Sequence, residues 1–474
     1  MFTRSRSSIL SHISNAERAV HHHSSLLRWV VMWWVVLAVV SIVGGPALTE
    51  KWLAWQWALG AAAMWGANLL LVVYGFGPPL HLSRPPVLAA AFAFLMTLLG
   101  SGSYWATTQL YPIYRVPIER AAWFVSVCTF AALLVAVATS RLLRSQVNAT
   151  PRPLSWNWSR LEAMAYVLFV LAFIGTVISI RRIGYIPVLT GDPTSARIDY
   201  PAIGGVGYRL SMLGGVAALL VAILAAARRA SLFTYAMGAA SLLLVGLYGP
   251  RFFVVLPLGV AILLWDRVRK PVRLGRAALL VAVAAPSLAF LGYLRERDRS
   301  VSLLGPVAFS LYGTIGEFRD LAWSLDYYGF GDRFLNGRTF GSVVVPLLPS
   351  PVWRVVGVDK SALYAQDSAT LLAQAMGQTT GQRIGAYGEL FMNYGWPGAL
   401  AGALLYGVLL GFLDDRNRRV DAGQVRAIFL ALVTAAAVFA QIGQLNMFTS
   451  TVTGIGYPLL IVALIAGRRV SSTE

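Results

Sequence analysis

The sequence predicts an all-α polytopic membrane protein with about twelve transmembrane helices and a large extracytoplasmic loop between helices 9 and 10. Two observations predict this fold class. Of the 474 residues, 57% are hydrophobic and only 12% are charged, whereas a soluble domain carries about 25% charged residues. The mean hydropathy is +0.65, and several segments exceed the roughly 18 apolar residues that mark a membrane helix.

The individual helices follow from apolar runs that are separated by polar, Gly-rich or Pro-rich connectors. In chain order, the predicted spans cover residues 29–45, 55–77, 86–110, 121–140, 161–180, 207–227, 231–249, 252–266, 275–294, 396–413, 425–443 and 450–467.

The orientation follows from the charges of the connectors. Every second connector is basic, and cytoplasmic loops carry the excess of Arg and Lys, so both termini are predicted to be cytoplasmic. The resulting organisation is a cytoplasmic tail (1–28), helices 1–9 with an outer loop at 181–206 (29–294), a large extracytoplasmic loop (295–395), helices 10–12 (396–467) and a second cytoplasmic tail (468–474).

Several classes of chemistry are disfavoured by composition. The N-terminal stretch is polar up to Trp29 and has no small-residue cleavage site, which indicates a retained first helix and not a cleaved signal peptide. The only cysteine is Cys128, so the chain cannot form an internal disulfide. All five histidines fall on the predicted cytoplasmic side, so no metal or cofactor is expected at the outer face. Basic residues gather at helix ends and not in one stripe, which argues against nucleic-acid binding.

The predicted outer face nevertheless carries many arginines. The positive-inside rule does not explain cations on this face, so they indicate an anionic ligand. A guanidinium fork holds two phosphate oxygens in parallel hydrogen bonds. A polyprenyl diphosphate presents phosphates at this depth, and fixed cations stabilise it as a sugar leaves. A carboxylate within about 3 Å of the acceptor hydroxyl supplies the base.

Four stretches, in this order, resemble the Wzy-type O-antigen and oligosaccharide repeat-unit polymerases. They are "IPVLTGDPTSARIDY" (186–200), "YGPRFFVVLPL" (248–258), "NGRTFGSVVVPLLP" (336–349) and "GAYGELFMNYGWPGAL" (385–400). The resemblance implies a bacterial inner-membrane glycosyltransferase that joins polyprenyl-diphosphate-linked oligosaccharides on the extracytoplasmic face. Its partners are that lipid-linked glycan and the bilayer, together with a chain-length regulator where one exists.

The resemblance also implies site residues. It assigns catalysis to Arg197, Arg251 and Glu389, and it places Arg338 on a diphosphate; the Arg, ten residues, Gly spacing of some members is absent. Charge and position add further substrate-binding candidates. The complete binding set is Arg338, Arg383, Arg319, Asp199 and Tyr200.

Each assignment has a structural alternative. Arg197 can pair with Asp192 or Asp199. The side chain of Arg251 can reach the membrane–water interface with its charged end, and Glu389 can orient Arg383.

Glu317, Arg319 and Asp320 can form a surface ion-pair cluster. Tyr200 offers its ring to a sugar or anchors the loop. Asp414 and Asp415, beside Arg416, are interpreted as a solvated helix end.

Two other functions stay open. The first is an O-antigen ligase-like transferase. The related O-antigen ligases favour a histidine on the outer face, and the predicted outer face of this chain has none. The second is a flippase or anion transporter for lipid-linked glycans, which is expected to carry charge deep within several helices. The predicted spans here are nearly uncharged.

Overall fold

The structure is a computed structural model of the chain. It describes residues 50–77, 81, 83–108, 118–144, 154–187, 190, 203–248, 252–268, 317–329, 333–348, 350–377, 384–420, 424–441 and 443–469. The predicted spans at 29–45 and 275–294 lie outside these residues, as do five of the candidate site residues: Arg197, Asp199, Tyr200, Arg251 and Arg383.

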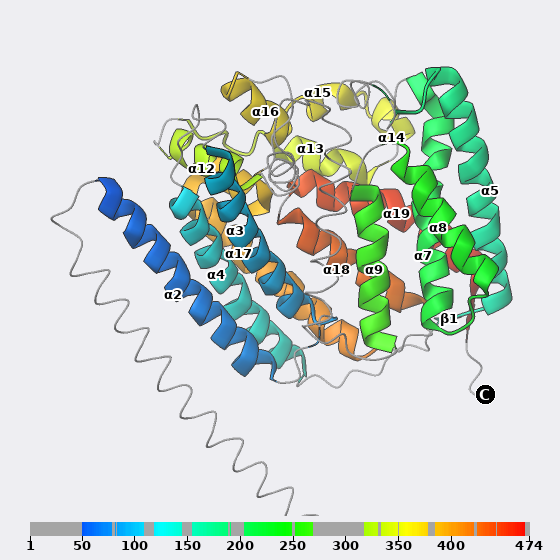
Figure 1. The fold of residues 1–474 in the computed structure, drawn as a ribbon, viewed down its shortest axis with the longest axis horizontal. Helices are drawn as coiled ribbons and strands as arrows, with labels where there is room; N and C mark the ends of the chain where they lie inside the picture. The colour runs from blue at the N-terminus through cyan, green and yellow to red at the C-terminus, as the bar shows by residue number, and fades with distance from the viewer. Residues whose placement is uncertain are drawn as a thin grey trace, which may run out of the picture.

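The described chain is a bundle of long helices with short helices over one end (Figure 1). The long elements are α2 (Glu50–Phe76), α3 (Pro85–Thr108), α4 (Ile118–Arg144), α5 (Trp158–Ile183), a helical stretch Ile203–Ala226 that ends in α7 (Leu213–Ala226), α8 (Leu232–Gly246), α9 (Phe252–Val268), α17 (Gly385–Arg418), α18 (Val425–Ala440) and α19 (Leu445–Ala466). The short helices over one end are α12 (Glu317–Tyr327), α13 (Phe340–Val344), η2 (Val345–Leu347), α14 (Ser350–Val355), α15 (Lys360–Tyr364) and α16 (Ser368–Ala375).

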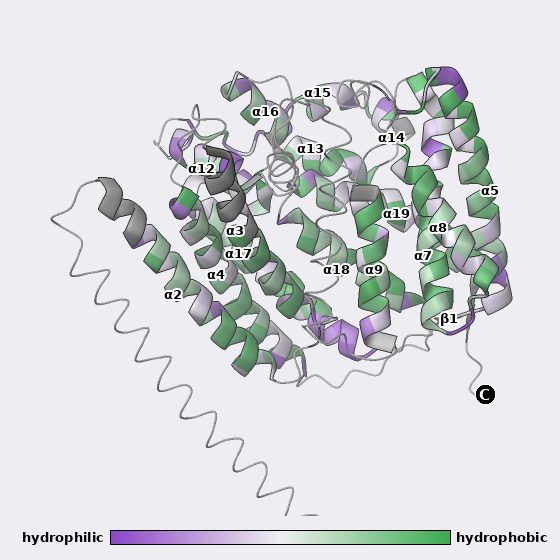
Figure 2. Cartoon of the chain, viewed as in Figure 1, coloured by the Kyte–Doolittle hydropathy of each residue, from purple (hydrophilic) through white to green (hydrophobic). Residues whose placement is uncertain are grey.

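The coarser part of the predicted fold class is confirmed: the protein is an α-helical, multi-pass membrane protein. Six described helices are long and apolar enough to cross a bilayer, and four further apolar helices are shorter. Every predicted span that falls on described residues overlaps a helix. Figure 2 shows apolar residues along the middle of the bundle and polar ones towards its ends. The apolar residues Val167, Val170, Phe173 and Ile174 of α5 are exposed at helical spacing, as expected of a lipid-facing surface.

Two helices form the centres of the two main cores. The first is α7, which is buried along nearly its whole length and packs between α5, α8 and α9. The second is α4, which packs against α2 and α17. Gly407 and Gly411 of α17 rest directly on the backbone carbonyls of Ala132 and Ala136, where a Cβ atom would collide. This is the small-xxx-small packing that membrane helices use for close approach.

The basic connectors meet at one end of the bundle, which is called the basic end below. A short antiparallel pair, β1 (Leu154–Trp156) and β2 (Gly467–Arg469), joins two of them. The Ser83 N–H donates to Asp266 Oδ2 over 2.8 Å and joins two more. The alternation of basic connectors along the sequence therefore corresponds to one shared end in space, whereas the short helices α12 to α16 cover the opposite end (Figure 1).

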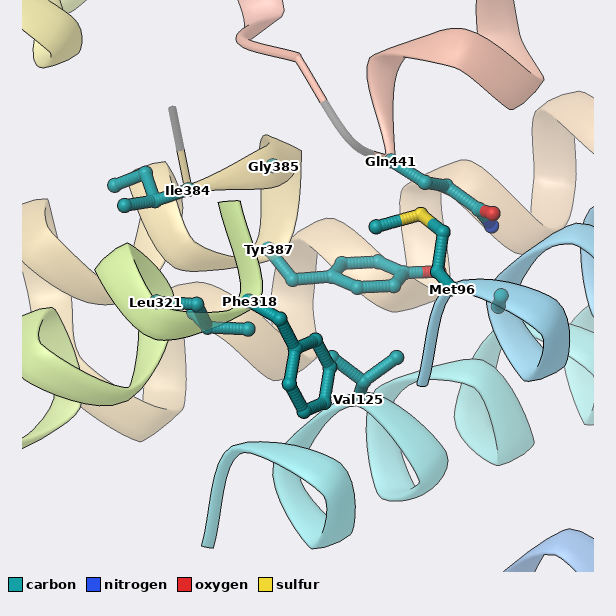
Figure 3. Close-up of a pocket in the computed structure, with 9 residues that line it drawn as sticks. Met96, Val125, Phe318, Leu321, Ile384, Gly385, Tyr387 and Gln441 are labelled. Carbon is teal, nitrogen blue, oxygen red and sulfur yellow. The ribbon is translucent and has the colours of Figure 1, made fainter. Parts of the chain in front are cut away.

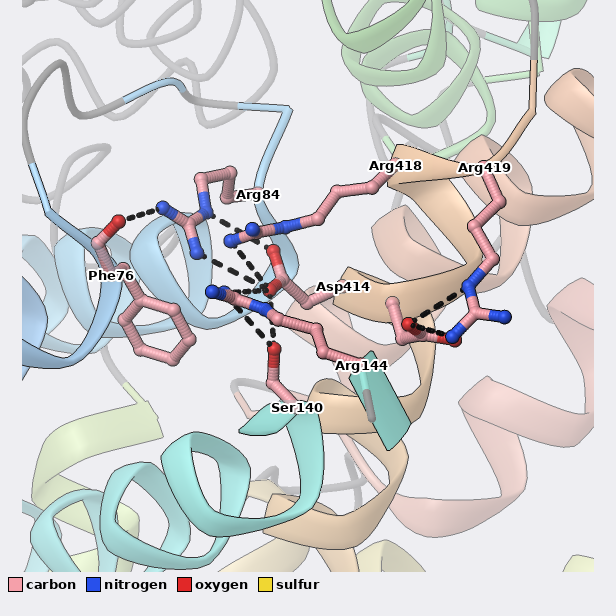
Figure 4. A network of polar contacts seen from close by, with 8 residues as sticks. Phe76, Arg84, Ser140, Arg144, Asp414, Arg418 and Arg419 are labelled. Carbon is pink, nitrogen blue, oxygen red and sulfur yellow. Dashed lines mark hydrogen bonds and ion pairs between the residues drawn. The ribbon is translucent and has the colours of Figure 1, made fainter. Parts of the chain in front are cut away.

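Asp414 is the centre of an ion-pair network at the basic end (Figure 4). Its carboxylate is 1% exposed, and Arg84 forks onto it with Nε–Oδ1 and Nη2–Oδ2 distances of 3.1 and 3.2 Å. Arg418 Nη2 lies 3.1 Å and Ser140 Oγ 2.9 Å from Oδ2. Burial lowers the pKa of the Arg84 guanidinium, and Asp414 opposes that shift. The network ties α3, α4 and α17 together.

The expectation of a solvated helix end at Asp414 and Asp415 is therefore wrong. Asp415 is also buried, and Arg419 Nη2 lies 2.8 Å from its Oδ1. Both carboxylates are enclosed because α4 ends against the last turns of α17: Arg419 also donates to the Leu143 carbonyl over 2.7 Å.

Replacement of the central carboxylate, Asp414→Asn, is expected to destabilise the fold. The change leaves the buried fork of Arg84 without a counter-charge, and breaking a buried pair from one side costs about 3–5 kcal/mol. Arg144 and Arg418 are more than a third exposed, so about 2 kcal/mol is expected after solvent screening. Thermal unfolding in detergent measures the change, with exposed Asp326→Asn as the matched control. Equal unfolding temperatures for the two variants would contradict the structural role.

Candidate functional site

The candidate site is built around a kink in α17. Tyr394 and Gly395 leave helical geometry, and Gly395 has φ +63° and ψ −152°. A side chain here would be strained by the positive φ, and its Cβ would lie 2.7 Å from Phe334. Pro397 follows and has no N–H to offer the carbonyl four residues earlier. The kink therefore leaves the carbonyls of Met392 and Asn393 without their usual helical partners.

The loop 333–339 supplies the missing donors. The N–H of Leu335 donates to Met392 O over 2.9 Å, and the N–H of Asn336 donates to Asn393 O over 3.1 Å. Because buried backbone groups need partners, this loop and this kink depend on each other. Two of the four stretches that carry the sequence resemblance, 336–349 and 385–400, are thus in direct contact.

Asn393 fixes the loop with its side chain as well. Its Oδ1 accepts from the N–H of Gly337 over 2.9 Å. Its Nδ2 donates to Thr339 Oγ1 over 2.9 Å and to the Glu389 carbonyl over 2.8 Å. Gly337 has φ +84°, and a Cβ there would collide with the Tyr394 hydroxyl, so glycine is required at this turn.

Glu389 lies one turn before Asn393 and is completely buried. Its Oε2 accepts from the N–H of Leu445 over 2.8 Å, at the first residue of α19, where the helix dipole favours a negative group. The hydroxyl groups of Thr339 and of Ser368, which is 1% exposed, are the side-chain donors nearest to this carboxyl group. Ser368, Thr339 and Asp367 are the polar neighbours of this carboxyl group.

The structure brings together only part of the predicted site. Arg338 lies within the loop 333–339 and is exposed, and among the described residues its side chain forms no hydrogen bond or ion pair. Arg319 instead lies against the neighbouring Asp320, with an Nη2–Oδ1 distance of 2.9 Å and Asp320 only 4% exposed. The expected ion pair is therefore present between Arg319 and Asp320, but it is buried and does not form a surface cluster. The five candidates outside the described residues stay predictions.

Sequence reasoning did not include three members of the site: Asn393, Thr339 and Ser368. The signal for Asn393 was present, because an amide directly before "YGWP" stands where a Gly–Pro kink frees carbonyls. Thr339 and Ser368 gave no signal of their own, since their role depends on a contact with a helix that is distant in sequence.

A small cavity lies on the other side of α17, between α3, α4, α12 and α18 (Figure 3). Apolar side chains line it, including Met96, Val125 and Phe318. The hydroxyl of Tyr387 and the amide of Gln441 both reach it and lie close to each other. The cavity has room for about one water molecule, which would satisfy both groups.

Metal ligands do not cluster at this site. Among the described residues, no group of three or more His, Cys, Asp or Glu side chains is placed to hold a metal ion. The arrangement instead offers a buried carboxyl group, two neighbouring hydroxyl groups and an exposed guanidinium in the adjoining loop.

Comparisons with known proteins do not add a family. No protein-family model matches the chain, and no curated protein or solved structure matches it. The fold and the site thus define a class, a helical multi-pass membrane protein with a buried acidic site at the end opposite the basic end.

Replacement of the amide that fixes the loop, Asn393→Leu, is expected to loosen residues 335–339. The substitution leaves the Gly337 N–H without its acceptor, and an unsatisfied buried group costs about 1–3 kcal/mol. Hydrogen exchange followed by mass spectrometry should show faster exchange in the peptide that covers this loop. The control is Asn336→Gly, which suits the φ of +48° at an exposed position. Unchanged exchange in the Asn393 variant would refute the role.

Proposed function

We propose that the protein is a bacterial inner-membrane glycosyltransferase that polymerises polyprenyl-diphosphate-linked oligosaccharide repeat units on the extracytoplasmic face. The proposal includes the full topology of about twelve spans, with both termini cytoplasmic and Glu389 on the outer side. The observation that carries it is the fully buried Glu389 carboxyl group, which has no cation partner among the described residues and lies against the loop that bears Arg338.

A second buried carboxyl group of α17, that of Asp414, can be compared with Glu389. At the basic end, the Asp414 oxygens receive guanidinium and hydroxyl donors, as expected of a structural ion pair. Glu389 is equally buried, yet among the described residues no cation pairs with it, and its neighbours are a backbone N–H and the hydroxyl groups of Thr339 and Ser368. A carboxyl group within a membrane helix is costly unless it has a role, and one without a counter-charge is suited to receive a proton.

The proposed reaction uses these groups as follows. The acceptor sugar hydroxyl attacks the anomeric carbon of the donor glycan, and the bond between that carbon and the diphosphate oxygen breaks. The hydroxyl proton passes to Glu389. Negative charge develops on the departing polyprenyl diphosphate, and Arg338 stabilises it together with Arg197, Arg251 and Arg383. Asp199 and Tyr200 complete the outer-loop part of the binding site.

Access to Glu389 requires movement, because the carboxyl group is 0% exposed in the structure. The loop 333–339 and α16 lie against it through Thr339 and Ser368. Displacement of this cover by an incoming glycan would expose the carboxyl group and afterwards exclude water from the reaction. Closure of that kind is a common step in enzymes that protect reactive intermediates.

Removal of the proton acceptor, Glu389→Gln, is expected to reduce elongation by at least about 10²-fold, the usual contribution of a general base. The amide oxygen still accepts from Leu445, so the unfolding temperature should stay close to that of the wild type. Purified protein is incubated with a lipid-linked oligosaccharide, and the glycan ladder is followed on a gel. Glu162→Gln is the matched control, since Glu162 of α5 accepts from Thr234 and Tyr166 instead. Wild-type ladders from the Glu389 variant would overturn the assignment.

Removal of the guanidinium in the loop, Arg338→Ala, is expected to weaken use of the lipid diphosphate. Arg338→Lys should recover part of the activity, because a lysine keeps the charge and loses the fork. Arg197→Ala and Arg251→Ala are expected to abolish polymer while single lipid-linked units persist. Arg354→Ala, at another exposed arginine of the same end, is the control. Normal chain lengths in the Arg338, Arg197 and Arg251 variants would contradict the proposal.

Two further experiments distinguish the proposed polymerase from the rival functions. Cells that lose a polymerase still attach one repeat unit to the final acceptor, whereas cells that lose a ligase attach none. A flippase or anion transporter would move the lipid-linked unit across vesicle membranes without lengthening it.

A further inference from the structure

The residues 340–358, which follow the loop directly and are called the cap segment here, are unusually apolar for a connector. They read "FGSVVVPLLPSPVWRVVGV" and contain one charged residue, Arg354. Charge returns immediately afterwards at Asp359 and Lys360. The described part of the cap segment folds as α13, η2 and α14, and it packs against α19.

The backbone of the cap segment satisfies much of its hydrogen-bonding capacity internally. Pro346 and Pro351 have no N–H to satisfy. The indole Nε1 of Trp353 donates to the carbonyls of Val345 and Leu348 over 3.0 and 3.2 Å. The Tyr457 hydroxyl of α19 donates to the Leu347 carbonyl. At the end of the segment, Val356, Gly357 and Val358 donate back to α14. Satisfaction of backbone groups within the protein is what a hydrocarbon environment demands of an irregular segment.

The outer surface of the cap segment is apolar and exposed within the described part of the chain. Val355 is 89% and Val356 63% exposed, and Leu347, Leu348 and Val352 are each about two-fifths exposed. The surface continues onto α19, where Tyr457, Leu460 and Ile461 are also exposed. Since α19 is one of the helices long enough to cross the membrane, its exposed apolar side faces lipid, and the Tyr457–Leu347 hydrogen bond joins the two surfaces.

We propose that the cap segment lies in the bilayer, with Val355 and Val356 among the acyl chains of the leaflet at the Glu389 end. A lipid occupant is favoured over a protein partner because the surface continues that of a membrane-spanning helix. Exposed Arg354 extends its charge to the headgroups, and Asp359 and Lys360 mark the return of the chain to water. This inference does not depend on the proposed reaction.

Insertion has a consequence for the site. The cap segment begins at Phe340, directly after Thr339, which Asn393 holds beside Glu389. An anchored cap segment would keep the loop 333–339 at the level of the headgroups, where the diphosphate of a lipid-linked substrate lies.

Fluorescence quenching tests the depth of the segment. Val355→Cys and Ala362→Cys are each made in a Cys128→Ala background, so that each chain has one cysteine. Both positions are exposed, so neither change should disturb the fold. The full chains carry an environment-sensitive fluorophore at that cysteine and are reconstituted, one copy per nanodisc, in phosphatidylethanolamine and phosphatidylglycerol. Spin-labelled lipid and aqueous iodide serve as the two quenchers.

The expected result is opposite behaviour at the two positions. The label at Val355 should be quenched several-fold more by spin-labelled lipid than the label at Ala362, and several-fold less by iodide. Strong iodide quenching at Val355 would show that the surface faces water. Protection from both quenchers would show that the surface is covered by protein. Either of these results would overturn the proposal.

Discussion

The organisation of the site depends on one constraint: a membrane helix that breaks must find new partners for its freed backbone groups. In α17 the break at Tyr394 and Gly395 leaves two carbonyls without helical partners. The N–H groups of Leu335 and Asn336 donate hydrogen bonds to them. Neither the kinked helix nor the tight loop is stable alone in a low-dielectric environment. Their mutual satisfaction determines where Thr339 and Arg338 lie relative to Glu389.

The two ends of α17 treat buried charge in opposite ways. At its C-terminal end, Asp414 is surrounded by donors from the start of α3, from α4 and from its own helix, so its charge is balanced and its geometry is fixed. At its N-terminal end, Glu389 has one backbone donor and two neighbouring hydroxyl groups, and no cation pairs with it among the described residues. The same helix thus carries a structural carboxylate within an ion-pair network and a buried carboxyl group without a counter-charge. That difference, more than burial itself, distinguishes a candidate catalytic group from a structural one.

Sequence patterns predicted the helices well because membrane spans are local features. Length and apolarity identify α5 or α19 without knowledge of any neighbour. Alternating basic connectors also predicted correctly which connectors share an end. Pairings between distant residues were not accessible in the same way: Asp414 was taken for a solvated residue because Arg84 and Ser140 are far away in sequence. The predicted start at 396 corresponds to the part of α17 after the break at Tyr394 and Gly395, whereas the helical part from Gly385 to Asn393 was not predicted, because it is short and precedes the apolar run.

The kink also links the site to the membrane surface. It fixes the loop 333–339 through Asn393, and the loop passes without interruption into the cap segment, which packs on α19. The N-terminus of α19 in turn holds the Glu389 carboxyl group through Leu445. Each of four parts therefore contacts the next: Glu389, the loop 333–339, the cap segment and α19, which contacts Glu389 again. A displacement of the cap segment by a lipid would be transmitted to Thr339 and to the cover over Glu389, which couples access to the buried carboxyl group with what occupies the bilayer beside it.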